Sequence, residues 1–362
     1  MSGSISGEEA YLLGCLFGRG SIEAAKTKDY YLIFRIPFRE YSPVAVETIK
    51  ALLNETKGLT SDEILEIPKV KVHGIINVGL LLNRLRKWHP PRKLVKKPLL
   101  RKDKERWKIN DFKLAKEFLK WQEIYLERET VGIKDYVLKH LRETTTFLAT
   151  SPDYSEEISE FGIVNHIIRC EITPHTFGTL SSKYGLEEGD IYRHARIPKS
   201  IFDFPKEALE EFVRGLADTI ATIDVWRIPR IQFSVINDNY GLPIDICEIL
   251  QKHLKIPVFY IGWAGKYAKR GGRDHLVKVW TVHFDEPMFS QPLFYNKRKQ
   301  EEFLYHLNIA KKWLKNQKKK YTWLKPCPRY GKKKGYMKTC VEYGCKQLPT
   351  GLVQFMTHEG KD

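Results

Sequence analysis

The stretch RIPKSIFDFPKEALEEFVRGLADT, residues 196–219, combines a helix start, an amphipathic helix and a glycine within that helix. Pro205 suits the first helical position, and Glu207 and Glu210 place acidic side chains in the opening turns. Apolar residues then recur at helical spacing, at Leu209, Phe212, Val213 and Leu216. Gly215 stands out, because a glycine inside a helix costs ~1 kcal/mol relative to alanine. We therefore expect this helix to approach another backbone closely at Gly215.

A second segment of the same kind lies near the start of the chain. Residues 8–22 read EEAYLLGCLFGRGSI. When LLGCLFGRG (12–20) is aligned with VRGLADTIA (213–221), Gly14 coincides with Gly215. Two glycine-bearing helices, each opening a similar downstream pattern, predict two related domains that pack through these helices. Because one chain carries both copies, we expect a monomer.

Similar elements are expected after each helix. In the first copy the pattern predicts strands at 21–25 and 30–38, a helix at 42–53, a strand at 64–73 and a helix at 75–88. In the second copy it predicts strands at 222–226 and 230–236, a helix at 242–254, strands at 257–263 and 276–284, and a helix at 298–314. The expected class is α+β, with two αββαββα units. The expected boundaries are 1–126, a mostly helical insert at 127–203, the second unit at 204–316 and a basic extension at 317–362.

The positive charge of the chain is concentrated in two places. There are 61 Lys and Arg against 44 Asp and Glu, which gives a net charge of +17. Residues 84–108 hold twelve basic and two acidic residues, and residues 311–346 hold thirteen and one. Such clustering is typical of a protein that binds the phosphate backbone of nucleic acid. The alternatives are a basic face that is merely solvated and binding to an acidic membrane surface. Interleaved aromatic residues favour nucleic acid, namely Trp88, Trp107, Trp313, Tyr321, Trp323 and Tyr330.

The two glycine-bearing motifs resemble those of the LAGLIDADG homing endonucleases. The segment RIPKSIFDFPKEALEEFVRG is similar to the lead-in to the second domain of such proteins. The resemblance implies two helices crossing at a pseudo-twofold axis, two sheets forming a saddle over double-stranded DNA, and a catalytic acid at the last-but-one motif position. Arg19 and Ile220 occupy those positions here, and neither can bind a divalent metal as a carboxylate would.

Two function classes follow from this departure. The first is a site-specific, Mg²⁺-dependent DNA endonuclease whose acids have been relocated, with Asp218, Asp224 and Glu23 as catalytic candidates. Solvent-exposed strand acids are the ordinary interpretation of Glu23 and Asp224. The second class is a catalytically inactive DNA- or RNA-binding protein, such as a regulator or an intron-splicing helper. Base excision without a metal is a third, minor hypothesis.

Candidate nucleic-acid contacts come from four parts of the chain. A basic antiparallel ribbon can enter the major groove and read base edges. Arg19 lies at the end of the first motif helix. The expected strands contribute Arg35, Lys69, Lys71, Arg230, Gln232 and Lys278. The glycine-rich segment 265–274 contributes Lys266, Lys269 and Arg270, and the basic extension contributes Lys318, Lys319 and Lys320.

The segment TLSSKYGLEEGDIYRHARI, residues 179–197, has the spacing of a helix-turn-helix. On that hypothesis residues 180–184 form one helix, Gly185 the turn, and residues 188–194 the second helix. Acidic residues near the start of the second helix, Glu187, Glu188 and Asp190, would repel phosphates. A structural helical insert is therefore the favoured interpretation.

A cluster of cysteines near the end of the sequence is a candidate zinc site. Cys327, Cys340 and Cys345 cluster before His358, and three Cys with one His could hold zinc, although a close Cys-x2-Cys pair is missing. Free thiols or a local disulfide are the alternatives.

No apolar run approaches the ~20 residues of a membrane span, and the start lacks a signal-peptide pattern. We expect an intracellular protein, in the cytoplasm or nucleoid, that does not bind membranes.

Overall fold

The structure is a computed structural model. It describes residues 7–26, 28–38, 42–72, 78–88, 97–144, 148–158, 164–224, 230–236, 241–254, 256, 260–270, 273–284 and 292–315. The chain divides into two compact units. Unit 1 comprises residues 1–36, 134–153 and 168–362, and unit 2 comprises residues 37–133 and 154–167.

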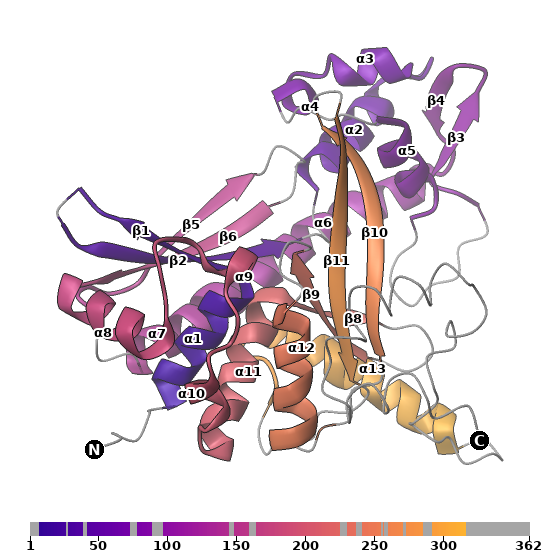
Figure 1. The fold of residues 1–362 in the computed structure, drawn as a ribbon. Helices are drawn as coiled ribbons and strands as arrows, with labels where there is room; N and C mark the ends of the chain where they lie inside the picture. Colours follow the sequence, from indigo (N-terminus) through magenta and orange to yellow (C-terminus); the bar gives the residue numbers. More distant parts are fainter. Residues whose placement is uncertain are drawn as a thin grey trace. The chain divides into compact units, whose positions relative to one another are not determined.

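Two helix–hairpin segments of the same design form the centre of unit 1 (Figure 1). Helix α1 (Gly7–Arg19) leads directly into β1 (Gly20–Ala24) and β2 (Tyr30–Phe38), and α11 (Lys206–Ile220) leads into β8 (Ala221–Asp224) and β9 (Arg230–Ile236). Both hairpins are antiparallel. The first strand residue pairs with a buried phenylalanine in each, Gly20 with Phe34 and Ala221 with Phe233. The two segments are therefore structural repeats.

The sheets have the same strand order. One is ordered β5-β6-β2-β1-β7, where β5 is Asp153–Ile158, β6 is Val164–Ile172 and β7 is Gly189–Asp190. The other is ordered β10-β11-β9-β8, where β10 is Tyr260–Arg270 and β11 is Arg273–Phe284. In this arrangement β5 and β6 correspond to β10 and β11. The α+β class with antiparallel sheets is thus confirmed.

Residues 127–203 contain strands as well as helices. Besides its helices, this segment contributes three strands, because β5, β6 and β7 all come from it and belong to the first sheet. The alternative interpretation of residues 180–194 as a helix-turn-helix does not match the structure. Helix α8 (Pro174–Tyr184) ends at Gly185 in the left-handed conformation (φ 64°), but residues Gly189–Asp190 then pair with β1. Only the four-residue α9 (Ile191–His194) and α10 (Lys199–Phe202) follow.

The second half of unit 1 largely follows the predicted order. Helix α12 (Gly241–Glu248) continues into the π-helix η2 (Ile249–His253), and α13 (Lys297–Lys315) follows the sheet. The glycine-rich segment 265–274 was expected to be a loop. Most of it instead extends β10 and β11 into a long antiparallel hairpin, with residues paired up to Arg270 and Arg273.

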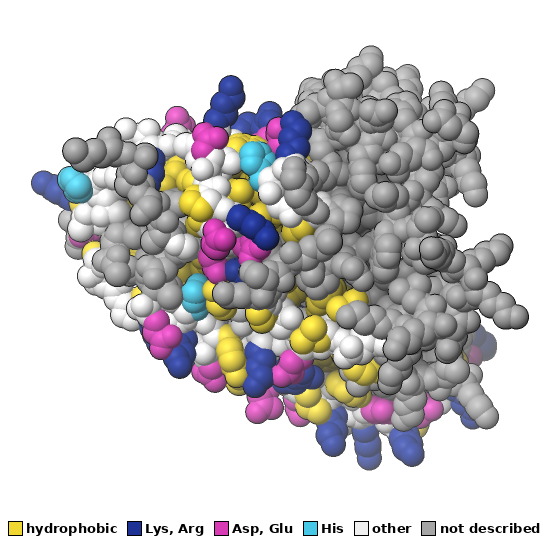
Figure 2. All heavy atoms as spheres, turned by 90° about the horizontal axis from the view of Figure 1, so that it is seen from below, with side chains coloured by type: hydrophobic (Ala, Val, Ile, Leu, Met, Phe, Trp, Pro, Cys, Tyr) yellow, Lys and Arg dark blue, Asp and Glu magenta, His cyan; other side chains and the backbone are white. Residues whose placement is uncertain are grey.

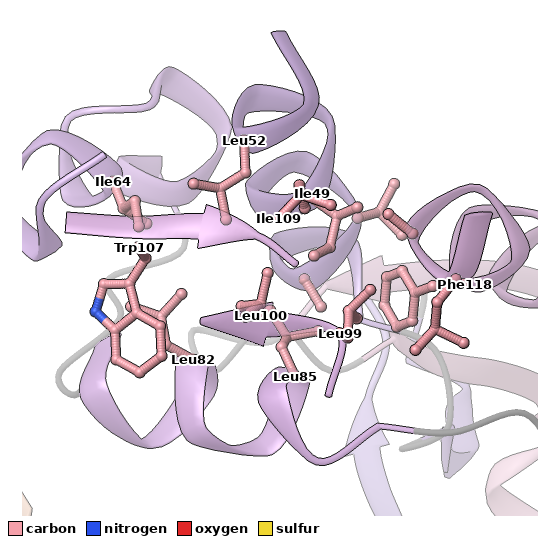
Figure 3. Packing of buried hydrophobic residues seen from close by; sticks show 14 of the residues in the cluster. Ile49, Leu52, Ile64, Leu82, Leu85, Leu99, Leu100, Trp107, Ile109 and Phe118 are labelled. Carbon is pink, nitrogen blue, oxygen red and sulfur yellow. The ribbon is translucent and has the colours of Figure 1, made fainter. Parts of the chain in front are cut away.

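Unit 2 contains its own hydrophobic core. Its elements are α2 (Pro43–Asn54), α3 (Ser61–Leu65), α4 (Pro68–Val72), α5 (Val78–Arg86), β3 (Leu100–Asp103), β4 (Arg106–Ile109) and α6 (Phe112–Val131). Side chains from all of these except α4 meet in one buried cluster (Figure 3). The π-helix η1 (Gly132–Leu138) and α7 (Lys139–Thr144) then return the chain to unit 1.

The strand expected at 64–73 is wrong, because this region is helical. A complete capping box starts α3: Glu63 N donates to Thr60 Oγ1, and Thr60 N donates to Glu63 Oε2. Pro68 then begins α4 instead of interrupting a strand. These local starting signals outweigh the apolar–polar alternation of the segment.

Candidate functional site

Helices α1 and α11 pack side by side with their backbones in contact (Figure 1). A Cβ atom added at Gly14 would overlap the carbonyl oxygen of Phe212, and one at Gly215 would overlap the carbonyl oxygen of Tyr11. A Cβ at Gly18 would likewise overlap Thr219 Oγ1. The structure thus places Gly14 and Gly215 at the helix contact, where only glycine allows this distance between the backbones.

The two last-but-one motif positions lie at equivalent helix ends. Arg19 is the final residue of α1 and is half-buried, and Ile220 is the final residue of α11 and is only 5% exposed. A cation and a buried hydrocarbon therefore stand where the resemblance implies acids.

Asp218 lies fully buried between α1, α11 and the start of α13. Its Oδ2 accepts hydrogen bonds from the Tyr11 hydroxyl (2.9 Å) and the Tyr295 backbone N–H (3.1 Å). Its Oδ1 accepts one from the Asn296 backbone N–H (3.1 Å). Burial raises the pKa of Asp218 to about 6, although the Lys299 ammonium and these donors oppose the rise. The surroundings of this carboxyl group are those of a structural acceptor.

Glu23 and Arg35 share the open face of the first sheet. Arg35 donates to Ser21 Oγ (2.7 Å) and to Glu23 Oε1 (3.1 Å), and the Glu23 side chain is 49% exposed. Beside them the Arg169 guanidinium lies over the Tyr31 ring, 5.3 Å from its centroid. Arg35 is therefore held in place on an exposed strand surface, with an acid as its partner. The side chain of Asp224 lies outside the described part, so no distance joins it to Glu23.

The described carboxylates near the helix ends do not form a site for a divalent metal. Magnesium prefers carboxylate and water oxygens. Of the described carboxylates near these ends, Asp218 is enclosed by protein donors and Glu23 pairs with Arg35. Across the described ranges no group of three His, Cys, Asp or Glu side chains could hold a metal ion. The zinc candidates Cys327, Cys340, Cys345 and His358 lie outside those ranges.

Of the other predicted contacts, the structure describes the side chains of two, Lys71 and Gln232. Lys71 lies on helix α4, not on a strand, and pairs with Glu66 (2.6 Å). Gln232 is half-buried on β9 and donates to Ser234 Oγ (3.1 Å). Lys69 also lies on α4, and only its backbone is described. The same holds for the predicted contacts on β9, β10 and β11, namely Arg230, Lys266, Lys269, Arg270 and Lys278. Lys318, Lys319 and Lys320 fall outside the described residues.

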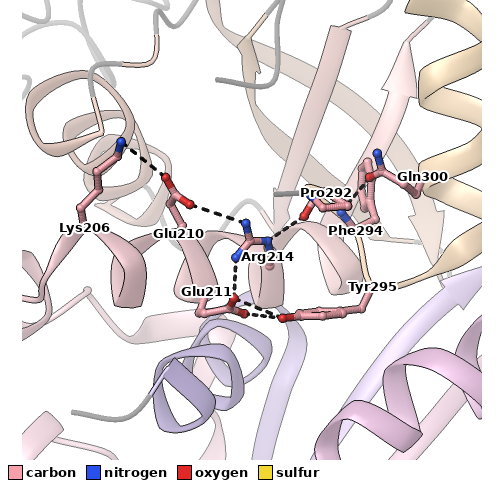
Figure 4. A network of polar contacts seen from close by, with 8 residues as sticks. All are labelled: Lys206, Glu210, Glu211, Arg214, Pro292, Phe294, Tyr295 and Gln300. Atoms are coloured by element: carbon pink, nitrogen blue, oxygen red, sulfur yellow. Dashed lines mark hydrogen bonds and ion pairs between the residues drawn. The ribbon is translucent and has the colours of Figure 1, made fainter. Parts of the chain in front are cut away.

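A buried polar network on α11 escaped the sequence analysis (Figure 4). Charged residues at the spacing of Lys206, Glu210 and Arg214 ordinarily lie on the solvent-facing side of a helix. In the structure Glu210 and Arg214 are 3% and 2% exposed. Arg214 donates to the carbonyl oxygen of Pro292 (2.7 Å) and to Glu211 Oε1 (2.5 Å), and the Tyr295 hydroxyl also donates to Glu211. Only the i, i+4 acid–base spacing pointed to this arrangement.

Charges on the visible surface are mixed. In the view from below, basic and acidic side chains of the described residues lie interspersed, with hydrophobic side chains between them (Figure 2). None of the helices in the described ranges combines the length and hydrophobicity needed to cross a lipid bilayer.

No protein-family model matches the chain, and no curated protein matches its sequence.

Proposed function

We propose that this chain binds double-stranded DNA on a paired-helix scaffold of the LAGLIDADG type, without the cleavage chemistry of that family. The observation that carries the proposal is the repeated helix–hairpin. Helices α1 and α11 meet at Gly14 and Gly215, and each leads at once into an antiparallel hairpin with matching register. Together with a net charge of +17, this supports a duplex-binding protein.

Loss of cleavage is supported by the residues at the helix ends. Hydrolysis of a phosphodiester with metal ions needs carboxylates that converge on the scissile phosphate. Arg19 would repel a divalent cation, and Ile220 offers no ligand atom. Asp218 is the motif acid nearest to Ile220, but its oxygens already accept three hydrogen bonds inside the protein. A DNA-binding regulator therefore fits the described residues better than a nuclease.

A relocated nuclease centre is the second candidate. Half-exposed Glu23, three residues past the first motif, favours it, because its carboxylate lies on the open sheet face rather than in the core. Such a centre would need further carboxylates, and Asp224 is the sequence candidate.

Cleavage is the first property to test. We expect the parent protein to retard a duplex but to leave supercoiled plasmid intact with Mg²⁺, since the motif positions lack metal ligands. The comparison is the double variant Arg19→Asp with Ile220→Asp, with Arg19→Asn and Ile220→Asn as the isosteric control. Gain of nicking by the Asp variant alone supports a decayed site. Strong Mg²⁺-dependent cutting by the parent that Glu23→Gln abolishes would instead establish the relocated centre.

Salt dependence tests the basic extension. Each phosphate contact contributes a log–log salt slope of about −0.9 through counterion release. Changing Lys318, Lys319 and Lys320 to alanine should therefore make the slope shallower by about 2.7 without altering sequence preference. The matched control removes three exposed lysines from α6, Lys113, Lys116 and Lys120. If the extension variant keeps the parent slope in a titration from about 0.05 M to about 0.2 M salt, the extension does not contact phosphates.

A further inference from the structure

One face of the β1–β2 hairpin carries a cation and an acid side by side. Side chains alternate between the two faces of a sheet, so Ser21 and Glu23 of β1 share a face with their cross-strand partners Ile33 and Tyr31. Arg35, two residues after Ile33, lies on this face as well. The residues between Ser21 and Glu23 and between Ile33 and Arg35 are buried in the core. On the open face the side chains of Arg35 and Glu23 remain 31% and 49% exposed.

Arg35 is held at both of its terminal nitrogens. Nη1 donates to Ser21 Oγ (2.7 Å), and Nη2 donates to Glu23 Oε1 (3.1 Å). The Ser21 hydroxyl, which belongs to a residue only 1% exposed, donates in turn to the same Glu23 oxygen (3.3 Å). The three side chains thus form a closed set of hydrogen bonds, which fixes the direction of the guanidinium relative to the carboxylate.

Both charged groups keep bonding capacity for a ligand. A terminal guanidinium nitrogen carries more than one hydrogen, so the contacts to Ser21 and Glu23 leave a donor on each nitrogen. The hydrogen bonds that Glu23 accepts from the described residues all go to Oε1, and none of them goes to Oε2. The pair therefore presents a donor fork beside an acceptor oxygen.

The pair is electrically neutral, unlike the two basic concentrations of the sequence. A carboxylate beside the guanidinium repels a phosphate group, so attraction to phosphates does not describe this pair. Exposed ion pairs also contribute little to the stability of a fold. The ligand that suits the pair is one that offers acceptors and a donor next to each other.

A G·C base pair in the major groove of DNA has this pattern. The groove admits a two-stranded ribbon, and the base pair shows the N7 and O6 acceptors of guanine next to the N4 donor of cytosine. Arginine pairs with these guanine atoms, and a carboxylate accepts from cytosine N4. An A·T pair would instead turn the adenine N6 donor toward the guanidinium and the thymine O4 acceptor toward the carboxylate.

We propose that Arg35 and Glu23 together specify one G·C base pair of a duplex DNA target. Arg35 donates to guanine N7 and O6, Glu23 accepts from cytosine N4, and Ser21 is a positioning residue that holds both. This inference rests on the proposed duplex binding, and it assigns Glu23 to base reading instead of metal binding. It commits to DNA over duplex RNA, because the major groove of RNA is too deep and narrow for side chains to read.

The first test compares charge-neutral double variants of the full-length chain. Preferred duplexes of about 30 base pairs, roughly three helical turns, are selected from a random pool. Glu23→Ala with Arg35→Ala should lower the preference for G·C at one position by about 5- to 150-fold, and the log–log salt slope should stay at the parent value because no phosphate contact is lost. The matched control is Lys139→Ala with Glu143→Ala, an exposed ion pair of α7, which should keep the preference. Equal melting temperatures of the two variants show that both remain folded.

Two further measurements separate base reading from a structural role. Glu23→Gln with Arg35→Gln should move the preferred base pair at that position to A·T, because glutamine pairs with adenine N6 and N7. In the selected duplex, 7-deazaguanine at that position lacks the N7 acceptor and should weaken binding of the parent roughly tenfold or more, but not binding of the double alanine variant. The same sequence as an RNA duplex should bind the parent and the double alanine variant equally.

The outcomes distinguish this inference from the proposed function. Binding of duplex DNA with a G·C preference that survives in both pair variants would overturn the reading role and leave the paired-helix proposal standing. An RNA duplex that separates the parent from the double alanine variant as DNA does would overturn it too. Failure of the parent to bind any duplex DNA would overturn both proposals.

Discussion

Replacing Gly215 with alanine is expected to lower the free energy of unfolding by about 3 kcal/mol, near the upper end of typical overpacking costs. The added methyl group would overlap the carbonyl oxygen of Tyr11 and lie 2.8 Å from the backbone nitrogen of Cys15. Because these are backbone atoms of α1, no rotamer change can relieve the overlap. The helices must separate, and the buried side chains along them lose contacts together. Leucine at this position should be more destabilising still.

The chain offers a matched control for this substitution. Gly178 also lies inside a helix, α8, but a Cβ there would meet nothing within 4 Å. Gly178→Ala should therefore be neutral or stabilise the protein by up to ~1 kcal/mol, through helix propensity. Both variants can be compared by urea unfolding followed by circular dichroism. Equal midpoints for Gly215→Ala and the parent would show that α1 and α11 do not pack through this glycine.

Removing the Asp218 carboxyl group should lower the free energy of unfolding by about as much as Gly215→Ala. Asp218→Ala leaves the Tyr11 hydroxyl and the N–H groups of Tyr295 and Asn296 buried without their acceptor. An unsatisfied buried donor costs roughly 1–3 kcal/mol, so we expect a loss of at least about 3 kcal/mol. Tyr11→Phe removes only one of these hydrogen bonds and should cost about 1 kcal/mol. Urea unfolding of the three proteins measures both values.

The same residue makes stability depend on pH in a direction unusual for an aspartate. Its folded-state pKa is raised from 3.8 to about 6, so the native protein holds the proton more strongly than the unfolded chain does. This contribution to stability is full below about pH 4 and is lost as pH rises through 6. Two pKa units correspond to about 3 kcal/mol.

Asp218→Asn supplies the reference for this titration, because its amide does not ionise. Between pH 4 and pH 7 the free energy of unfolding of the parent should fall by about 3 kcal/mol relative to that of Asp218→Asn. Other titrating groups, including Glu211 with its pKa raised by burial, are shared by both proteins and largely cancel in the difference. Parallel pH profiles of the two proteins would contradict the assigned environment of Asp218.

Local patterns in the sequence were sufficient for the central elements. The helical spacing of apolar residues predicted α1 and α11, and β2 and β9 match their expected ranges of 30–38 and 230–236. A helix was expected at 42–53, and α2 lies there, with the Ser42 hydroxyl accepting from the Ala45 amide at its start (3.3 Å). Periodicity, capping residues and glycine costs act within a few residues, so they can be read without knowledge of the fold.

Elements that depend on distant partners could not be obtained in this way. The helix-turn-helix candidate at 180–194 had the expected residue spacing, but its second half pairs with β1 through Gly189 and Asp190. In unit 2 the bridge between Leu59 and Trp107, which are 48 positions apart, joins the β3–β4 hairpin to the segment before α3. The alternation at 64–73 concealed the start of a helical region, because the capping box at Thr60 and the packing of Ile64 outweigh strand propensity.

By itself, the sequence determined the two glycine-bearing helices, the hairpins that follow them, the α+β class and the two concentrations of positive charge. Only the tertiary structure decided which hairpin completes the first sheet, that Glu210 and Arg214 lie inside the protein, and that Asp218 joins α11 to the start of α13. The physical reason is that strand order and the burial of charged groups depend on contacts between residues far apart in the chain. Residue spacing indicates which residues share one face of a helix or strand, but not which other element packs against that face.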